Sequence, residues 1–194
     1  MTSTLVGYAG GSTDKPTYRS IGDHSETVLV EFDPAVISYA RLLEVFWASH
    51  DPTAKPYLTQ YRNAVFYTSE EQRQAAIASR QALQEKLDRE LDTAIEPAGI
   101  FTPAEDYHQK YYLQRVAPLM KELQQRYPDR QQLFHSTAAA RLNGYLGCNG
   151  DPASFGTDLR AVGLPAELEQ DLHDSLTASC REFKGSGCAL PPRL

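Results

Sequence analysis

The chain has 194 residues, 41% hydrophobic and 23% charged, with a formal net charge of −6 at pH 7. This length and composition predict one globular domain, or one domain with an appendage. The acidic balance argues against a nucleic-acid or anionic-membrane partner, and no apolar run approaches the roughly 18 residues that a membrane helix needs.

The predicted elements begin with a strand, Leu5–Ala9, which ends at a glycine-rich turn. Because a domain seldom starts inside a strand, we expect that an earlier strand and helix either have been lost or were never part of this product. The first residues show no basic segment followed by an apolar one. No signal peptide is therefore visible, and a cytoplasmic protein is expected.

Three more strands are predicted further along the chain. Apolar side chains alternate in Thr27–Phe32, where Val28 and Val30 lie on the same face. Asn63–Thr68 is a short apolar strand, and Asp92–Glu96 is a strand candidate that ends before a proline.

Helices are predicted between and after these strands. Ser38 is a good N-cap for a helix at Tyr39–Ser49, whose core-facing stripe consists of Leu42, Leu43, Phe46 and Trp47. A capping box that starts at Ser69 opens a long helix to about Arg89. Another helix is predicted from Pro103 to about Arg115, and Pro118–Arg126 continues it or restarts it after a kink. This alternation favours an α/β or α+β sandwich with helices on a mixed sheet.

The sequence changes character beyond Tyr127-Pro128. Leu133–Leu146 is apolar on one side, and a tight turn follows it. Pro165 occupies the first position of a helix that carries leucines at i, i+4 and i+8. We therefore predict two parts, a main domain at residues 1–130 and a helical appendage with a Gly/Cys tail at residues 131–194.

Several short motifs occur in an order typical of one family. They are Gly7-Tyr8-Ala9-Gly10-Gly11, Pro16-Thr17-Tyr18, Gly22–Glu26, Thr59-Gln60-Tyr61-Arg62 and Glu105–Leu113. On these motifs the chain, from roughly Thr2 to Leu113, resembles the A-type peptide methionine sulfoxide reductases. The resemblance implies an α+β fold, a ferredoxin-like two-layer plait, which an upstream strand and helix would complete.

Glu26 is the first candidate for chemistry. From the residues alone it is either a solvated turn carboxylate or, with Val28 and Val30 behind it, a carboxyl in apolar surroundings. Such surroundings keep a carboxyl protonated near neutral pH. The resemblance implies that Glu26 is the proton donor to the sulfoxide oxygen. It also implies that Tyr18 and Tyr61 hydrogen-bond that oxygen, which a phenol does without adding a charge.

The chain departs from the family pattern in three places. The family's nucleophilic Cys lies in a Gly-Cys-Phe-Trp motif upstream of Gly7, and this chain begins after that point. The Gly-Asn-Asp segment before Thr59 is absent, so the Asp expected to bind the substrate amide or a water has no counterpart. The loop between Tyr18 and Glu26 is shorter than the commonest form. Together the shorter loops predict a divergent branch with a different surface around the methionine.

The three cysteines are Cys148, Cys180 and Cys188, and an odd count without a secretion signal predicts free or redox-active thiols in a reducing compartment. In the family reaction a recycling Cys condenses with the sulfenic acid left on the nucleophile, and an external dithiol such as thioredoxin resets the pair. By resemblance, Cys188 and Cys148 are the recycling candidates. Cys180 is expected to be a structural thiol inside a helix. The alternative is that all three are bystander thiols.

Two functions stay open. The first is thiol-dependent reduction of methionine-S-sulfoxide, free or in proteins, to repair oxidative damage, by a monomer without a bound cofactor or metal. The second is an inactive homologue or binding module that recognises oxidised methionine, because the nucleophile is absent from the chain. A metal site at His24 and Glu26, with His50 and Asp51 as a second pair, is the weaker alternative to turn roles for these residues.

Overall fold

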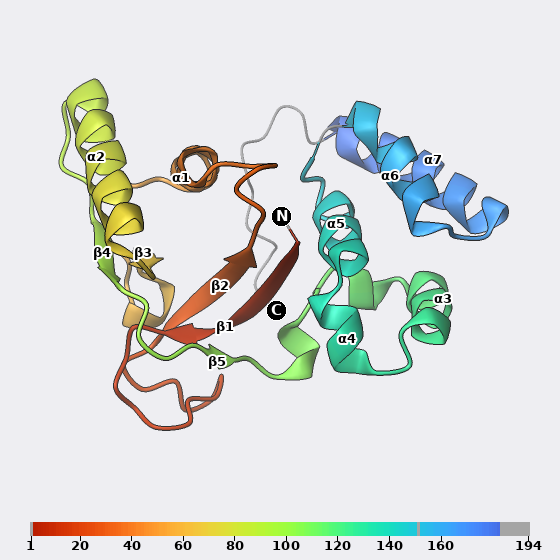
Figure 1. The fold of residues 1–194 in the computed structure, drawn as a ribbon, viewed down its shortest axis with the longest axis horizontal. Coiled ribbons are helices and arrows are strands. Elements are labelled where there is room, and N and C mark those ends of the chain that lie inside the picture. The colour runs from red at the N-terminus through yellow and green to blue at the C-terminus, as the bar shows by residue number, and fades with distance from the viewer. Residues whose placement is uncertain (1, 151, 183–194) are drawn as a thin grey trace. The chain divides into compact units, whose positions relative to one another are not determined.

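The computed structural model describes residues 2–150 and 152–182, which have a mixed α+β architecture (Figure 1). The chain forms two compact units, one from Val6 to Asp106 and the other from Thr2–Leu5 together with Tyr107 onward. The predicted division into residues 1–130 and 131–194 stays a prediction, because a compact unit is not by itself a domain that folds alone.

The strands of the chain belong to two sheets. In the first, β1 (Ser3–Ala9) lies between β2 (Ser25–Glu31) and β5 (Thr102–Pro103), and it pairs antiparallel with β5. In the second, β3 (Asn63–Tyr67) and β4 (Thr93–Pro97) pair in parallel. The four predicted strands are confirmed, with each boundary shifted by at most two residues. β2 is an edge strand of the described three-stranded sheet.

Two capped helices accompany the parallel pair. Ser38 caps α1 (Tyr39–Ala48) by accepting a hydrogen bond from the backbone N–H of Arg41, and Ser69 caps α2 (Glu70–Leu87) in the same way. Both helices and both caps are as the sequence predicts. α2 packs against β3 and β4, and α1 packs against α2 (Figure 1).

The core between these elements is small. Its buried members are Leu43 of α1, Val65 of β3 and Ala76 of α2, and Phe46 and Trp47 pack against them while partly exposed. The side chain of Ala76 is fully buried where α2 packs on the two strands. The predicted stripe of α1 therefore does face a core.

The helix predicted from Pro103 to Arg115 is wrong. The chain forms β5 there and then two single turns of 3-10 helix, η2 (Asp106–His108) and η3 (Leu113–Arg115). Lys110, between the two turns, has a φ of 47°, in the left-handed region. A continuous right-handed helix cannot pass through that conformation, so the segment breaks at this residue.

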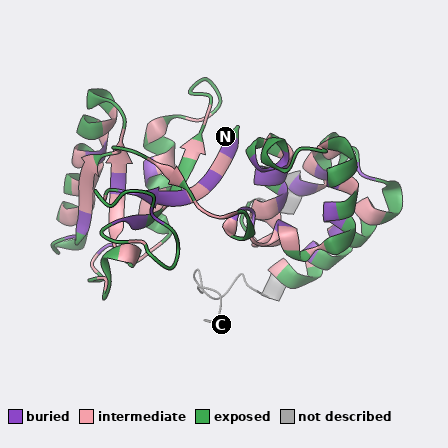
Figure 2. Cartoon of the chain, turned by 90° about the horizontal axis from the view of Figure 1, so that it is seen from below, coloured by how far each residue is buried: buried purple, intermediate pink, exposed green. Residues whose placement is uncertain are grey.

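The rest of the described chain is helical. It contains α3 (Ala117–Arg126), α4 (Arg130–His135), α5 (Thr137–Leu146), α6 (Pro152–Val162) and α7 (Ala166–Glu182). Their shared core includes fully buried leucines from several helices, and buried residues recur along these helices in Figure 2. The helical character predicted beyond Tyr127 is confirmed, whereas α6 has no counterpart among the predicted elements. No described helix combines the length and the hydropathy that crossing a bilayer requires.

Candidate functional site

Glu26 lies near the start of β2, and its side chain is exposed. The amide Nε2 of Gln60 donates a hydrogen bond to Oε1 of Glu26 over 2.6 Å. The expectation of apolar surroundings is wrong in this structure, because β2 is an edge strand and Val28 is itself 58% exposed. The carboxyl is therefore oriented by a polar partner rather than enclosed by apolar side chains.

Tyr61 is the last residue of the 3-10 helix η1 (Thr59–Tyr61), and its side chain is 54% exposed. This turn of helix packs against β2. Because Gln60 of η1 holds Glu26 of β2, the structure brings Glu26 and the segment that carries Tyr61 to one place. These two sequence-predicted site residues therefore belong to neighbouring elements.

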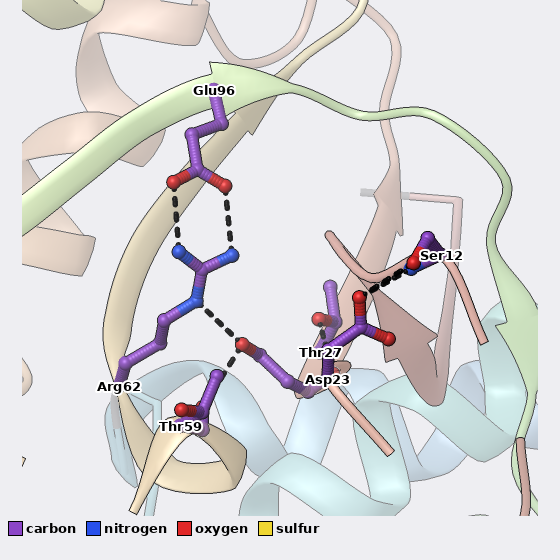
Figure 3. A network of polar contacts seen from close by, with 7 residues as sticks. Ser12, Asp23, Thr27, Thr59, Arg62 and Glu96 are labelled. Carbon is purple, nitrogen blue, oxygen red and sulfur yellow. Dashed lines mark hydrogen bonds and ion pairs between the residues drawn. The ribbon is translucent and has the colours of Figure 1, made fainter. Parts of the chain in front are cut away.

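A polar network fixes the position of η1 on β2 (Figure 3). The hydroxyl of Ser25, which is buried, donates to the carbonyl of Thr59 over 3.1 Å and accepts from Nε of Arg62 over 2.7 Å. The guanidinium of Arg62 in turn donates two hydrogen bonds of 2.7 Å to the carboxylate of Glu96 on β4. The residues beside Glu26 and Tyr61 are thus tied to each other and to the second sheet.

Tyr18 lies at the tip of a tight turn and is 40% exposed. The turn is closed by two backbone hydrogen bonds between Thr17 and Ser20. The backbone N–H of Tyr18 donates to Oε1 of Glu105 over 3.1 Å, and the phenol of the buried Tyr8 donates to Oε2 over 2.6 Å. Glu105 therefore anchors the Tyr18 turn to β1, the strand next to β2.

Asp23 closes the base of the loop that presents Tyr18. Its carboxylate accepts four hydrogen bonds, two from Ser12 and two from Thr13, over 2.7 to 3.0 Å (Figure 3 shows those from Ser12). These hydrogen bonds, with the Thr13 hydroxyl first, hold the pKa of Asp23 far below its usual range. The carboxylate therefore stays charged and keeps the two ends of the loop together.

A family model described as "Peptide methionine sulfoxide reductase" matches residues 1–141. The chain belongs to the peptide methionine sulfoxide reductase family. By family it is an oxidoreductase, as the motifs predicted. Nothing in these comparisons favours the alternative of an inactive homologue or binding module.

The matches to relatives cover different shares of this chain and of the relatives. The peptide methionine sulfoxide reductase of Drosophila melanogaster is 42% identical over 169 residues, which are 86% of this chain and 68% of that protein. Peptide methionine sulfoxide reductase A5 of Oryza sativa subsp. japonica is 45% identical over 148 residues, 73% of this chain and 58% of that protein. The chain thus spans little more than half the length of the rice relative.

Solved structures of the family share the fold in part. The reduced form of Mxr1 from Saccharomyces cerevisiae is 30% identical, with a TM-score of 0.54, and the match covers 59% of this chain and 71% of that one. Methionine sulfoxide reductase A of Corynebacterium diphtheriae is 32% identical, with a TM-score of 0.53, over 59% of this chain and 63% of that one. These matches support the mixed α+β architecture of the family.

Of the thiols expected to be free or redox-active, two are not free. Cys148, in the turn after α5, is disulfide-bonded to Cys180, 32 residues further on. Cys180 lies inside the helix α7, as predicted, and packs partly buried against the helical core. No signal in the sequence indicated this pairing, because 32 residues of separation fit no short cysteine motif. Cys188 lies outside the described residues.

The histidines considered as metal ligands make contacts with the backbone. Nε2 of His24 lies 2.8 Å from the carbonyl oxygen of Thr13, and Nδ1 of His50 lies 2.8 Å from that of Phe46. Within the described ranges, no three His, Cys, Asp or Glu side chains gather in a way that could hold a metal ion. Each histidine serves the local turn or helix end.

Sequence reasoning missed the side chains that hold the predicted ones in place, namely Asp23, Gln60, Arg62, Glu96 and Glu105. A signal for four of them existed, since Gln60 and Arg62 flank Tyr61 within one motif, Glu105 opens another, and Asp23 lies in the motif that ends at Glu26. Glu96 stands outside every motif, and only the pairing of β3 with β4 brings it to Arg62.

Proposed function

We propose that this chain presents the part of a peptide-methionine (S)-S-oxide reductase that binds the sulfoxide and donates the proton. Glu26 is the proton donor to the sulfoxide oxygen, and the phenols of Tyr18 and Tyr61 donate hydrogen bonds to it. The observation that carries the proposal is the hydrogen bond of 2.6 Å from Gln60 to Glu26, which joins the carboxyl to the helical turn of Tyr61. One oxygen of Glu26 is then oriented, and the other is available to carry a proton.

These roles imply a reaction in three stages, which are reduction of the sulfoxide, formation of a disulfide and reduction of that disulfide. A cysteine thiolate, in a Gly-Cys-Phe-Trp motif outside these 194 residues, attacks the sulfoxide sulfur while Glu26 protonates the sulfoxide oxygen. The S–O bond of the sulfoxide and the transient S–S bond then break as the hydroxyl passes to the cysteine sulfur, so methionine is released and the cysteine is left as a sulfenic acid. A second thiol condenses with the sulfenic acid, water leaves, and a disulfide forms. An external dithiol of the thioredoxin class then reduces that disulfide.

Two cysteines are candidates for the second thiol. Cys148 lies in a turn with a φ of 56° and shares a disulfide with Cys180, a pair that a dithiol reductant could open. Cys188 stays a candidate from its glycine-rich sequence. We also propose that the protein is a cytoplasmic monomer, since a reductant of this class acts in a reducing compartment.

We further propose that the fold is a ferredoxin-like plait in which one more strand pairs with β2. Val28 on this strand is 58% exposed, and Leu29 is exposed as well, so both faces of β2 lack cover among the described residues. An uncovered apolar edge strand is costly, because its backbone groups and its side chains both lack partners. A strand at this edge would also cover Glu26 from solvent.

The proposal is tested by titrating the 194-residue chain with the S and R epimers of N-acetyl-methionine sulfoxide and following its NMR spectra. We expect the S epimer to bind and Glu26→Gln and the double variant Tyr18→Phe/Tyr61→Phe to weaken that binding. Tyr127→Phe, which changes a tyrosine that packs on the helical core and lies outside the family motifs, is the matched control. Equal affinity of all these variants for the S epimer would overturn the proposal, provided that circular dichroism shows them folded.

A further inference from the structure

Arg62 is connected to both Glu26 and Tyr61, whose spacing matters most in the proposed site, and this inference rests on that proposed function. Tyr61 directly precedes Arg62 in the sequence. Nε of Arg62 contacts Ser25, the residue directly before Glu26. We propose that Arg62, together with Glu96, is a positioning residue that sets the distance and orientation of Glu26 relative to Tyr61.

The guanidinium contacts three acceptors at once. Nη1 and Nη2 each donate to one carboxylate oxygen of Glu96 over 2.7 Å, and Nε donates to the Ser25 hydroxyl over 2.7 Å. Figure 3 shows the fork of Arg62 facing both oxygens of Glu96. Only arginine has donors for this arrangement, because a lysine ammonium is a single point of charge on a flexible stem.

The Ser25 hydroxyl both donates and accepts a hydrogen bond. It accepts from Arg62 and donates to the carbonyl of Thr59, the first residue of η1. Ser25 is almost fully buried, so water does not replace either bond easily. The backbone of β2 beside Glu26 and the backbone at both ends of η1 are therefore joined through one hydroxyl and one guanidinium.

The positive charge of the partly buried Arg62 is balanced by a nearby carboxylate. Its side chain is 20% exposed, and the carboxylate of Glu96 neutralises it from β4, a strand of the other sheet. The ring of Phe66 lies 5.6 Å from the guanidinium carbon and covers one face of it. Glu96 thus keeps Arg62 extended toward Ser25, which is why the pair and not Arg62 alone is proposed to position the site.

A purely structural ion pair between strands is the competing explanation. It would lower stability when broken but would leave the geometry of Glu26 and Gln60 in the folded state unchanged. The side-chain amide of Gln60 reports that geometry directly, because its Nε2 donates to Glu26. Its NMR shift separates the two explanations at a temperature where every variant is folded.

The test compares Arg62→Lys, Glu96→Gln and the double variant with the unaltered 194-residue chain. We expect the Gln60 side-chain amide to shift toward its value in Glu26→Ala, and the affinity for the S-sulfoxide probe to fall about tenfold, since small misplacements of a binding group cost one to two orders of magnitude. The double variant should resemble either single variant, because the two residues act as a unit. Arg73→Lys is the matched control, since it alters an exposed pair with Glu70 on α2.

An unchanged Gln60 amide shift and unchanged affinity in Arg62→Lys, with only a lower melting temperature, would overturn the inference. The unaltered chain and Glu26→Gln tell the two proposals apart. If Glu26→Gln loses affinity while Arg62→Lys does not, the positioning role is wrong and the proposed function stands. If neither the unaltered chain nor any variant binds the S epimer, the proposed function fails first.

Discussion

Gln60 donates a hydrogen bond of 2.6 Å to Glu26, and the two side chains are contributed by segments 34 residues apart. The contact leaves one oxygen of the carboxyl with an amide partner. In the role proposed for Glu26, a general acid that delivers its proton over a short distance and in one direction, the amide of Gln60 would supply that direction.

Removal of this donor should therefore impair the site without unfolding it. We predict that Gln60→Leu weakens binding of the S-sulfoxide severalfold, about what one hydrogen bond between neutral groups contributes. The affinity is measured by NMR titration. Gln74→Leu removes a comparable amide contact to Glu70 on the exposed surface of α2 and should leave the affinity unchanged. Equal losses in both variants would show that the effect is not specific to Glu26.

The loop that presents Tyr18 should depend on Asp23. We predict that Asp23→Ala frees residues 12–23, so that this loop is cleaved faster by limited proteolysis and the S-sulfoxide binds more weakly. The charged carboxylate accepts all four hydrogen bonds, and its pKa is lowered by them. Its contribution is thus present above the ordinary carboxyl pKa and is lost only as the pH falls far below it, which predicts an intact loop at about pH 4.

Asp33→Ala is the control for this loop, because Asp33 caps another exposed turn through one hydrogen bond to Ala35. Its proteolysis pattern around Tyr18 should match that of the unaltered chain. Cleavage of residues 12–23 at the same rate in Asp23→Ala would contradict the role given to Asp23.

Lys110 should make stability depend on pH in the alkaline range. Its ammonium is buried and donates to the carbonyl of Thr4, and burial lowers its pKa from 10.5 to about 8. The folded state then loses its proton before the unfolded chain does, so the free energy of unfolding rises from about pH 8 to about pH 10.5. The expected rise is on the order of 2 kcal/mol, from about 1.4 kcal/mol for each pKa unit and incomplete burial.

Urea unfolding of the unaltered chain and of Lys110→Met across this range measures the effect. The variant should lack the rise, whereas Lys121→Met, at an exposed position of α3, should retain it. Parallel curves for the unaltered chain and Lys110→Met would mean that other groups govern the alkaline behaviour.

The disulfide should stabilise the helical part of the chain. In the loop-entropy account, a link between residues 32 positions apart lowers the entropy of the unfolded chain. It thereby raises the free energy of unfolding by about 3 to 4 kcal/mol. We therefore predict that Cys148→Ser, or reduction with dithiothreitol, lowers the denaturant midpoint of α5 to α7. Cys188→Ser should have no such effect in the oxidised protein. If Cys148→Ser, the reduced protein and Cys188→Ser all have the same denaturant midpoint, the bond between Cys148 and Cys180 does not form in solution.

The sequence predicted the regular elements well where local signals agree with the fold. Ser38 and Ser69 mark their helices because a cap satisfies backbone donors that any helix leaves open. The segment after Pro103 was mispredicted because the left-handed conformation of Lys110 depends on tertiary contacts, including its bond to Thr4. The network of Arg62 was beyond prediction for the same reason, since Glu96 meets it only through the pairing of two strands.

The unequal cores of the chain have a consequence for how the site behaves over time. The helices from α3 onward share many fully buried leucines, whereas the elements around β2 and η1 share few buried residues. Segments with few buried contacts open most readily, so amide hydrogens of β2 and η1 should exchange with solvent sooner than those of α3 and α5. The elements that carry the proposed site should therefore open locally while the helical part stays folded.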